Sequence, residues 1–364
     1  MIKYLGSKRR LVPVLGDLCS AVGAARALDL FTGTTRVAQE FKRRGANTTA
    51  VDSARYAFEF ARAYVALDGG HADRRELAAA LADLQARPDR DGYVTETFCR
   101  KSRFFRPHNG RRIDAIRDAI EHDYRDSWMY PVLLTSLIEG ADRVDSTTGV
   151  QMAYVKQWAD RAHKDLELRL PDLVAGPGTA VFGDACALVE ELGEFDVAYL
   201  DPPYNQHRYF TNYHIWETLV AWDAPVHYGV ACKRVDARDT STKSVFNDRR
   251  RMPCALNHVI GSVDARLVVV SYNDEAWVSI DDLRAMASAR GGAVHVLAFD
   301  SKRYVGAQIG IHNPRGEKVG QVSRLRNVEY LVLAGEPELV ARAVDAAERS
   351  GRHPGGVPRI TTTW

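Results

Sequence analysis

Several features that mark particular classes of protein are missing from this sequence. Its five cysteines are scattered and none forms a CxxC pair, which argues against a zinc site and against a disulfide framework. The start, MIKYLGSKRR, lacks the apolar core of a secretory signal, and no segment approaches the length of a membrane span. We therefore expect no membrane association and a reduced, cytoplasmic location.

Glycine patterns that bind phosphates are missing as well. The stretch DLFTGTT at 29–35 carries one glycine, Gly33, where a dinucleotide site needs three, and GxxxxGK[ST] does not occur. Asp52 stands 23 residues after Asp29, at the end of the next predicted strand, where an acid can bind ribose hydroxyls. These residues favour a nucleoside without phosphates, such as S-adenosylmethionine. They are equally compatible with no ligand, if Gly33 only makes a turn and Asp52 caps a helix.

An excess of charge of one sign is absent, since the formal net charge of the 364 residues is +2. A nucleic-acid partner would therefore require clustered basic residues. Three basic runs with aromatic neighbours are present, at 99–112, 243–251 and 301–304. One such run alone is best explained as a solvated face, whereas three together favour a nucleic-acid partner somewhat more.

Strand and helix patterns alternate at both ends of the chain. Strand patterns at 26–31 and 47–53 alternate with helix patterns at 37–45 and 54–70, which is the opening of a doubly wound α/β sheet. Helical spacing dominates from 71 to 178. Further strands are expected at 179–185, 195–201, 265–273, 292–299 and 327–335, followed by a last helix from 336 to 350.

The most informative stretch is FDVAYLDPPY at 195–204. Pro202 and Pro203 end a buried strand because neither can donate to a sheet ladder. A proline also holds the preceding residue extended, so the oxygens of Asp201 and Pro202 should have a fixed direction. Open α/β sheets place their ligands at this end of their strands.

Together these motifs resemble the adenine-N6 DNA methyltransferases of the Dam-like D12 class, in the order of the alpha group. IKYLGSKRRL resembles the amino-terminal motif that holds the methionine carboxylate, DLFTGTT the glycine motif and AVDS the ribose-binding acid. FGDA resembles the motif that contacts the cofactor adenine, and DPPY is the catalytic motif. The runs DPPYNQHRYFTNYH, SYN and NVEYL are most similar to the FokI-type modification methylases, so the resemblance spans about 1–335.

The resemblance implies a Rossmann-like, S-adenosylmethionine-dependent methyltransferase sheet with an inserted helical target recognition domain. The expected domains are a discontinuous catalytic domain at 1–70 and 179–335, the insertion at 71–178, and a C-terminal helix and tail at 336–364. The implied cofactor is S-adenosylmethionine, with S-adenosylhomocysteine as product and no metal. The implied partner is double-stranded DNA in the nucleoid, and a separately encoded restriction nuclease or defence system stays open.

Site residues are carried over motif by motif. The catalytic residues would be Asp201, Pro202 and Tyr204. The cofactor-binding residues would be Tyr4, Lys8, Asp29, Phe31, Gly33, Asp52, Asp184, Ala185 and Asp201. The candidate DNA contacts are Arg103, Arg106, Arg111, Arg112, Asn205, Tyr209, Tyr213, Lys243, Arg249, Arg250, Lys302 and Arg303.

Two other functions remain compatible with the sequence. One is a methyltransferase acting on an RNA base or on cytosine N4, although many cytosine-N4 enzymes carry serine where Asp201 stands. The other is an inactive paralogue that binds DNA without turnover, which the intact DPPY argues against.

Overall fold

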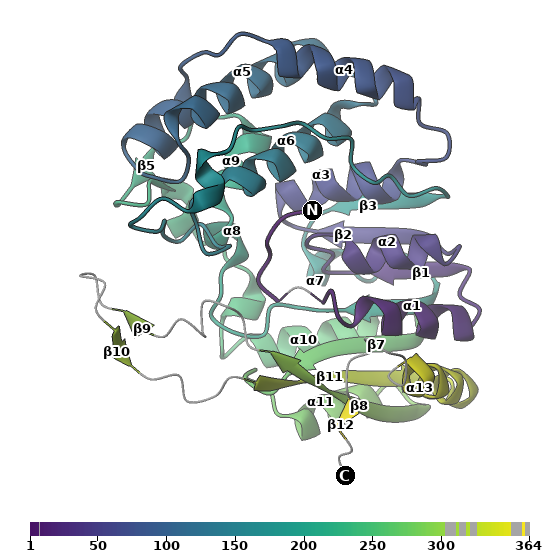
Figure 1. The fold of residues 1–364 in the computed structure, drawn as a ribbon. Coiled ribbons are helices and arrows are strands. Elements are labelled where there is room, and N and C mark those ends of the chain that lie inside the picture. Colours follow the sequence, from purple (N-terminus) through teal and green to yellow (C-terminus); the bar gives the residue numbers. More distant parts are fainter. Residues whose placement is uncertain (7, 303–310, 313–317, 321–325, 351–358, 361–364) are drawn as a thin grey trace.

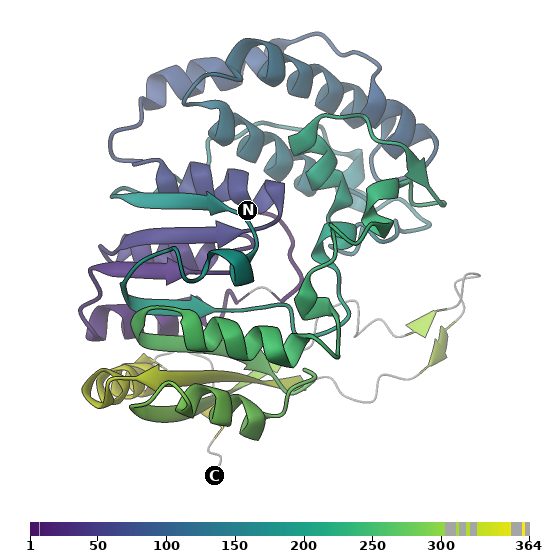
Figure 2. The same ribbon diagram turned by 180° about the vertical axis from the view of Figure 1, so that it is seen from behind.

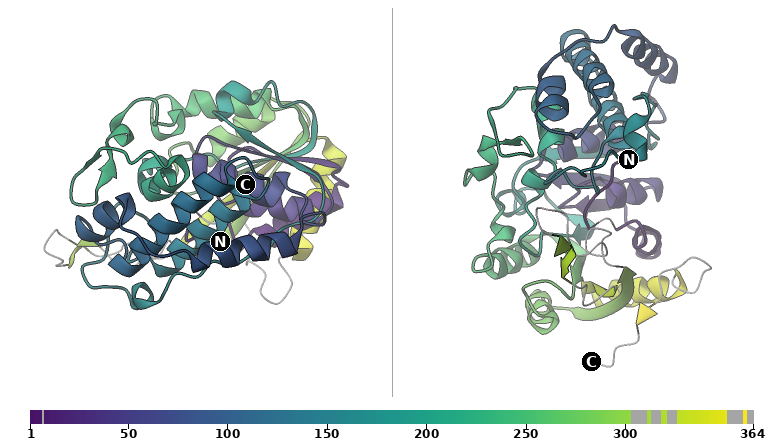
Figure 3. Two further views of the ribbon diagram at one scale, coloured as in Figure 1. Left: turned by 90° about the horizontal axis from the view of Figure 1, so that it is seen from above. Right: turned by 60° about the vertical axis from the view of Figure 1, so that its left-hand side comes forward.

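The structure is a computed structural model, and it describes residues 1–6, 8–302, 311–312, 318–320, 326–350 and 359–360. A central sheet carries helices on both faces, and a group of helices lies beyond its β3 edge, at the top of Figure 1. The same layers are seen from behind in Figure 2 and from above and the side in Figure 3. Within the described residues, no helix is long and apolar enough to cross a membrane.

The sheet is mostly parallel, with the order β12-β8-β11-β7-β4-β1-β2-β3. Strands β3, β2, β1, β4 and β7 pair in parallel, and β11 runs antiparallel to both β7 and β8. The strands are β1 (Arg26–Asp29), β2 (Asn47–Asp52), β3 (Gly178–Phe182), β4 (Phe195–Leu200), β7 (Ala265–Asn273), β8 (Ala293–Lys302), β11 (Arg326–Gly335) and β12 (Arg359–Ile360). Because the chain leaves β1 on one side and returns on the other as β4, a ligand crevice is expected where β1 and β4 end.

Helices cover the two faces of the sheet through separate apolar clusters. On one face the cluster joins β4, β7 and β11 to α1 (Val12–Ala21), α2 (Arg36–Arg43) and α13 (Pro337–Ser350). On the other it joins the strands to α7 (Ala185–Leu188), α10 (Met252–Ser262) and α11 (Ile280–Ser288). Central strands buried on both faces are near-continuously apolar, as LVVV in β7 is. The predicted Rossmann-like α/β class is confirmed.

The region predicted as a helical insertion is helical. It contains α4 (Arg74–Ala86), α5 (Pro107–Tyr124) and α6 (Tyr130–Val144). Their apolar residues share one cluster with α3 (Arg55–Ala61) and α9 (His214–Ala221), so these helices are built onto the catalytic domain. The helix expected over 54–70 is α3 followed by a π-helical turn, Arg62–Ala66. That the region acts as a separate target recognition domain remains a prediction.

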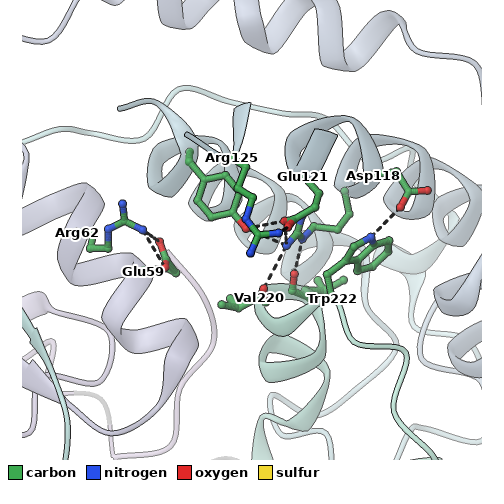
Figure 4. A network of polar contacts seen from close by, with 10 residues as sticks. Glu59, Arg62, Asp118, Glu121, Arg125, Val220 and Trp222 are labelled. Atoms are coloured by element: carbon green, nitrogen blue, oxygen red, sulfur yellow. Dashed lines mark hydrogen bonds and ion pairs between the residues drawn. The ribbon is translucent and has the colours of Figure 1, made fainter. Parts of the chain in front are cut away.

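Arg117 of α5 joins the helical region to α9. Its guanidinium is buried and donates to the carbonyls of Leu219 (2.5 Å) and Val220 (3.1 Å), and it pairs with Glu121 (2.9 Å). Figure 4 shows Glu121 and Asp118 of α5 facing the end of α9, where the Trp222 indole donates to Asp118 (2.7 Å). These contacts fix the insertion against the segment that follows the DPPY motif.

The remaining elements are short. They are a π-helical turn at Thr95–Arg100, 3-10 turns at Asp160–His163, Val235–Arg238 and Val245–Asn247, α8 (Tyr209–Asn212), and two small hairpins, β5 (His227–Tyr228) with β6 (Lys233–Arg234) and β9 (Ile311–His312) with β10 (Lys318–Gly320). The predicted C-terminal helix is α13. Of the predicted tail, only Arg359 and Ile360 belong to the described residues, and they pair with β8.

Candidate active site

The turn after β1 is arranged around the carboxylate of Asp29. Asp29 is 1 % exposed, and its Oδ2 accepts the Thr32 hydroxyl (2.9 Å) and the Ala38 amide (3.0 Å). Its Oδ1 is buried and has no hydrogen-bond partner within the part of the chain that the structure describes. Burial raises the pKa of Asp29 to about 7. An unpartnered buried carboxylate oxygen at this turn suits a cationic or hydroxyl-bearing ligand.

Gly33 lies between Asp52 and Tyr4. Its amide donates to Asp52 Oδ2 (2.8 Å), while Asp52 Oδ1 accepts the Ala54 amide (2.9 Å). Burial raises the pKa of Asp52, against the effect of these amides. Gly33 has φ +50°, and a β-carbon there would lie 3.0 Å from the Tyr4 hydroxyl oxygen. The structure thus brings the predicted glycine turn, ribose acid and amino-terminal tyrosine together at one point.

Asp184 and Ala185 follow β3, at the carboxyl ends of the parallel strands, where Gly33 and Asp52 also lie. Asp184 is exposed, and its carboxylate caps α7 by accepting the amides of Cys186 (2.9 Å) and Ala187 (3.3 Å). Ala185 is buried, and Phe31 makes an edge-to-face contact with Phe246. In this structure Asp184 therefore serves as a helix cap, and its contact with the cofactor stays a prediction.

The DPPY segment follows β4 directly. The side chain of Asp201 is 19 % exposed, Pro202 is buried and Tyr204 is half-buried. Tyr204 makes an edge contact with Tyr272 of β7, and the Trp277 amide donates to the Tyr204 carbonyl (3.4 Å). The segment is therefore held from the β7 side and presents Asp201 and Tyr204 at the end of the sheet.

Lys8 pairs with two carboxylates in this structure. Its ammonium is 3.2 Å from Asp201 Oδ1, forms an ion pair with Glu329 of β11, and lies 5.7 Å from the centre of the Tyr204 ring. Burial raises the pKa of Asp201 to about 6, and Lys8 opposes that shift. Contact of Lys8 with a methionine carboxylate stays a prediction. Glu329 was missed by the sequence analysis, and the signal was a lone acid within the apolar run NVEYLVLAG.

A large pocket of about 960 Å³ opens beside these residues. Lys8, Tyr204 and Glu329 line it, with Tyr4 on the side of Gly33. Gly33, Asp52 and Asp201 are not among its lining residues, but Tyr4 packs on Gly33 and Lys8 pairs with Asp201. The other lining residues include Gly6, Arg10, Val150, Met152, Asn205, Gln206, His207, Arg208, Tyr209, Tyr228, Lys233, Glu275 and Asn327. A volume of this size is adequate for a nucleoside-sized ligand.

Three tyrosines stack beside this pocket, and two of them, Tyr4 and Tyr209, line it. Tyr4 lies 4.8 Å from Tyr213 and 5.3 Å from Tyr209, ring centre to ring centre. Tyr213 is 1 % exposed and its hydroxyl accepts the Leu5 amide (2.6 Å). Tyr213 therefore positions the amino-terminal segment, whereas Tyr209 and Asn205 line the pocket.

The predicted DNA contacts are spread over several surfaces. Arg103 and Arg106 both lie 4.7 Å from the centre of the Trp158 ring, and Arg106 contacts His163. Arg112 forms an ion pair with Asp89 (2.7 Å) and donates hydrogen bonds to backbone carbonyls, so it stabilises the helical insertion. Arg111 is half-buried, while Lys243, Arg249 and Arg250 are exposed. The side chain of Lys302 and the whole of Arg303 lie outside the described residues.

Comparison with known proteins points to one family. A sequence model of the D12 class N6 adenine-specific DNA methyltransferases matches residues 4–286. The Type II methyltransferase M.NlaIII of Neisseria lactamica is 30% identical over 320 residues, which cover 83% of this chain and 92% of that protein. The family acts on adenine N6 in DNA, not on RNA or on cytosine N4.

Two longer modification methylases are also similar. M.FokI of Planomicrobium okeanokoites is 30% identical over 194 residues, which cover 52% of this chain and 29% of that protein. The modification methylase StsI of Streptococcus sanguinis is 27% identical over 300 residues, which cover 78% of this chain and 45% of that protein. The chain thus spans less than half the length of these two relatives, and the predicted likeness to FokI-type methylases is confirmed.

Proposed function

Because the chain belongs to the D12 class of N6 adenine-specific DNA methyltransferases, we propose that it methylates one adenine within a specific site of double-stranded DNA after that base leaves the helix. Base flipping is required since a base that stays stacked inside a duplex cannot reach an active-site pocket. The pocket beside Tyr204 supports this proposal, because its volume of about 960 Å³ leaves room for a purine. An aromatic ring such as Tyr204 stabilises a stacked base by about 1–3 kcal/mol.

S-adenosylmethionine is the methyl donor that family membership implies. The residues present fit it, because Asp29 has a buried oxygen without a partner among the described residues, Asp52 is acidic and Gly33 has no side chain to block an approach. We propose that these three residues hold it together with Tyr4, Lys8, Phe31, Asp184 and Ala185. When bound, it supplies a methyl group activated by a sulfonium, a chemistry that needs no metal.

The amine of adenine is a poor nucleophile, because its lone pair is delocalised into the ring. We propose that the Asp201 carboxylate and the Pro202 carbonyl accept hydrogen bonds from the two N–H groups of this amine. The nitrogen can then become pyramidal, so that its lone pair points at the methyl group. Both acceptors are fixed beforehand by the proline pair, so little reorganisation is needed in the transition state. The proton that the methylated amine loses then passes to water.

Phosphate contacts would supply most of the affinity for DNA. Exposed cations near the pocket support this role, among them Lys243, Arg249 and Arg250. The same loop contains Asn247, whose amide donates to the carbonyls of Asn205 (2.8 Å) and His207 (3.1 Å) at the pocket. We also propose a separately encoded restriction nuclease as partner, because relatives are named modification methylases. A nucleoid location is proposed because the substrate is DNA.

Modification-detecting sequencing of DNA from a host that expresses the protein would test the proposal. We expect N6-methyladenine at one recurring sequence, and none in a host that expresses Asp201→Ala. That variant should still bind S-adenosylmethionine, because its lost carboxylate is an acceptor for the amine. Methylation of cytosine, methylation without a recurring sequence, or wild-type rates in Asp201→Ala would each contradict the proposal.

A further inference from the structure

Glu329 is a buried acid at the end of an apolar row. On β11 it shares a sheet face with Leu331 and Leu333, which pack under α1 and α13. Although it is a charged residue, its side chain is only 9 % exposed. Ser271 of β7 lies on the same face and donates its hydroxyl to Glu329 Oε1 (3.1 Å). A buried ion pair is often no more stabilising than apolar side chains of similar volume. Its presence here therefore points to a function other than stability.

The partner of Glu329 is the ammonium of Lys8, which also pairs with Asp201. The side chain of Lys8 is 7 % exposed, so these two carboxylates, and not water, are the main partners of its charge. One cation thus serves two anions, and the cluster keeps one negative charge when all three groups are ionised. If Glu329 were neutral, the Lys8 ammonium would neutralise Asp201 alone. The Asp201 carboxylate would then be a weaker acceptor for another N–H donor.

We propose that Glu329 is a positioning residue for methyl transfer, which shares the Lys8 ammonium with Asp201 and so leaves the Asp201 carboxylate free to accept the adenine amine. This inference rests on the proposed role of Asp201. Glu329 does not touch the base, and it acts through Lys8. It also fixes Lys8 near the Tyr204 ring, at the entrance to the place where the base would stack.

The electrostatics of Asp201 agree with this arrangement. Burial raises its pKa to about 6, Lys8 lowers it and Glu329 raises it again. Lys8 and Glu329 are the charged groups that act on Asp201, and Asp201 in turn raises the pKa of its other titratable neighbours, Asp29, Tyr199, Tyr204 and Tyr209. Removing the charge of Glu329 alone should therefore lower the pKa of Asp201 and shift the acid limb of the rate profile to lower pH.

The test uses the isosteric variant Glu329→Gln in single-turnover methylation of duplex DNA at saturating S-adenosylmethionine. We expect the rate at pH 8 to fall roughly tenfold, with the acid limb displaced to lower pH. The control is Glu336→Gln, which removes an exposed pair with Arg266 at the opposite end of β11 and should keep the wild-type rate and profile. Thermal melting of both variants shows whether either is misfolded.

A double-mutant cycle with Lys8→Gln separates a positioning role from a structural one. If Glu329 acts through Lys8, adding Glu329→Gln to Lys8→Gln should cause little further loss of rate. An unchanged rate in Glu329→Gln, an unmoved acid limb, or fully additive losses in the cycle would overturn the inference. Full activity of Asp201→Ala would instead overturn the proposed role of Asp201, so the two failures are distinguishable.

Discussion

The ring of Tyr4 packs directly over Gly33, where a β-carbon would lie 3.0 Å from the tyrosine hydroxyl oxygen and 3.1 Å from its ring. The same glycine has φ +50° and donates its amide to Asp52. The first turn of the sheet therefore has no room for a side chain between the ribose-type acid and the amino-terminal motif. Both the contact and the backbone conformation require glycine.

Gly33→Ala should consequently weaken binding of S-adenosylmethionine at least tenfold in calorimetric titrations, and should cost about 1 kcal/mol of unfolding free energy. Gly23→Ala is the matched control, because Gly23 has φ +67° and, among the described residues beyond its chain neighbours, no atom lies within 4 Å of its β-carbon position. The control should lose similar stability and keep wild-type affinity. Equal affinities in the two variants would show that the cofactor does not bind at Gly33.

Glu217 of α9 gives a prediction about pH and stability. Its side chain is 2 % exposed, and burial raises its pKa to about 7. A carboxyl group with a raised pKa stabilises the fold fully below its unfolded pKa, and this contribution is lost as the pH rises through about 7. The unfolding free energy of the wild type, measured relative to Glu217→Gln, should therefore fall by about 3 kcal/mol between pH 4 and pH 8.

Glu121 supplies a control of opposite sign for that measurement. Burial alone would raise its pKa, but hydrogen bonds from Tyr130 and Arg117 lower it overall. Its contribution should be present at neutral pH and be lost in acid, so the difference between wild type and Glu121→Gln should change in the other direction. Urea unfolding curves at several pH values provide both series. Parallel curves for wild type and Glu217→Gln would contradict the prediction.

The interface between the insertion and α9 gives a stability prediction. Arg117→Met should cost about 3 kcal/mol, because it removes a buried guanidinium and leaves the carbonyls of Leu219 and Val220 and the carboxylate of Glu121 without it. Arg125→Met is the matched control, since the Arg125 side chain is 70 % exposed and pairs with the same Glu121. An exposed pair contributes about 0–1 kcal/mol. Urea midpoints that do not distinguish the two variants would refute the assigned role of Arg117.

Local patterns in the sequence were sufficient for much of this architecture. The strands expected at 195–201 and 265–273 correspond to β4 and β7, and they were recognisable because their apolar runs end in prolines or polar residues. The D12 class followed from the order of the motifs. The helix over 54–70 was too long, since the pattern did not show the π-helical turn at Arg62–Ala66. A π-turn changes the hydrogen-bond register without a clear change in composition.

Long-range pairing was beyond the sequence. Lys8 and Glu329 are 321 residues apart, and only the antiparallel placement of β11 beside β7 brings them together. Thr35 illustrates a different gap, because it adopts φ +60°, a left-handed conformation that favours glycine. Nothing in the residue type of Thr35 indicates this backbone conformation, so the sequence could not predict it.

The exposed cations beside the pocket give a prediction about DNA affinity. The triple variant Lys243→Ala, Arg249→Ala and Arg250→Ala should weaken binding to any duplex, with or without the recognition site, because phosphate contacts carry no sequence information. Each phosphate contact adds about −0.9 to the slope of log K against log salt. Loss of three contacts should therefore reduce the magnitude of this slope by about 2–3. Fluorescence anisotropy over a range of salt concentrations measures this slope.

A triple variant with the same change of charge is the control for that series. Arg26 of β1 and Arg342 and Arg349 of α13 are exposed, lie outside the helical insertion and do not line the pocket, so their replacement by alanine should leave the slope near its wild-type value. If both triple variants reduce the magnitude of the slope equally, the effect comes from the net charge of the protein. If neither does, the loop that contains Asn247 lies away from the DNA, and the phosphate contacts must come from another surface, such as that of Arg103 and Arg106 on Trp158.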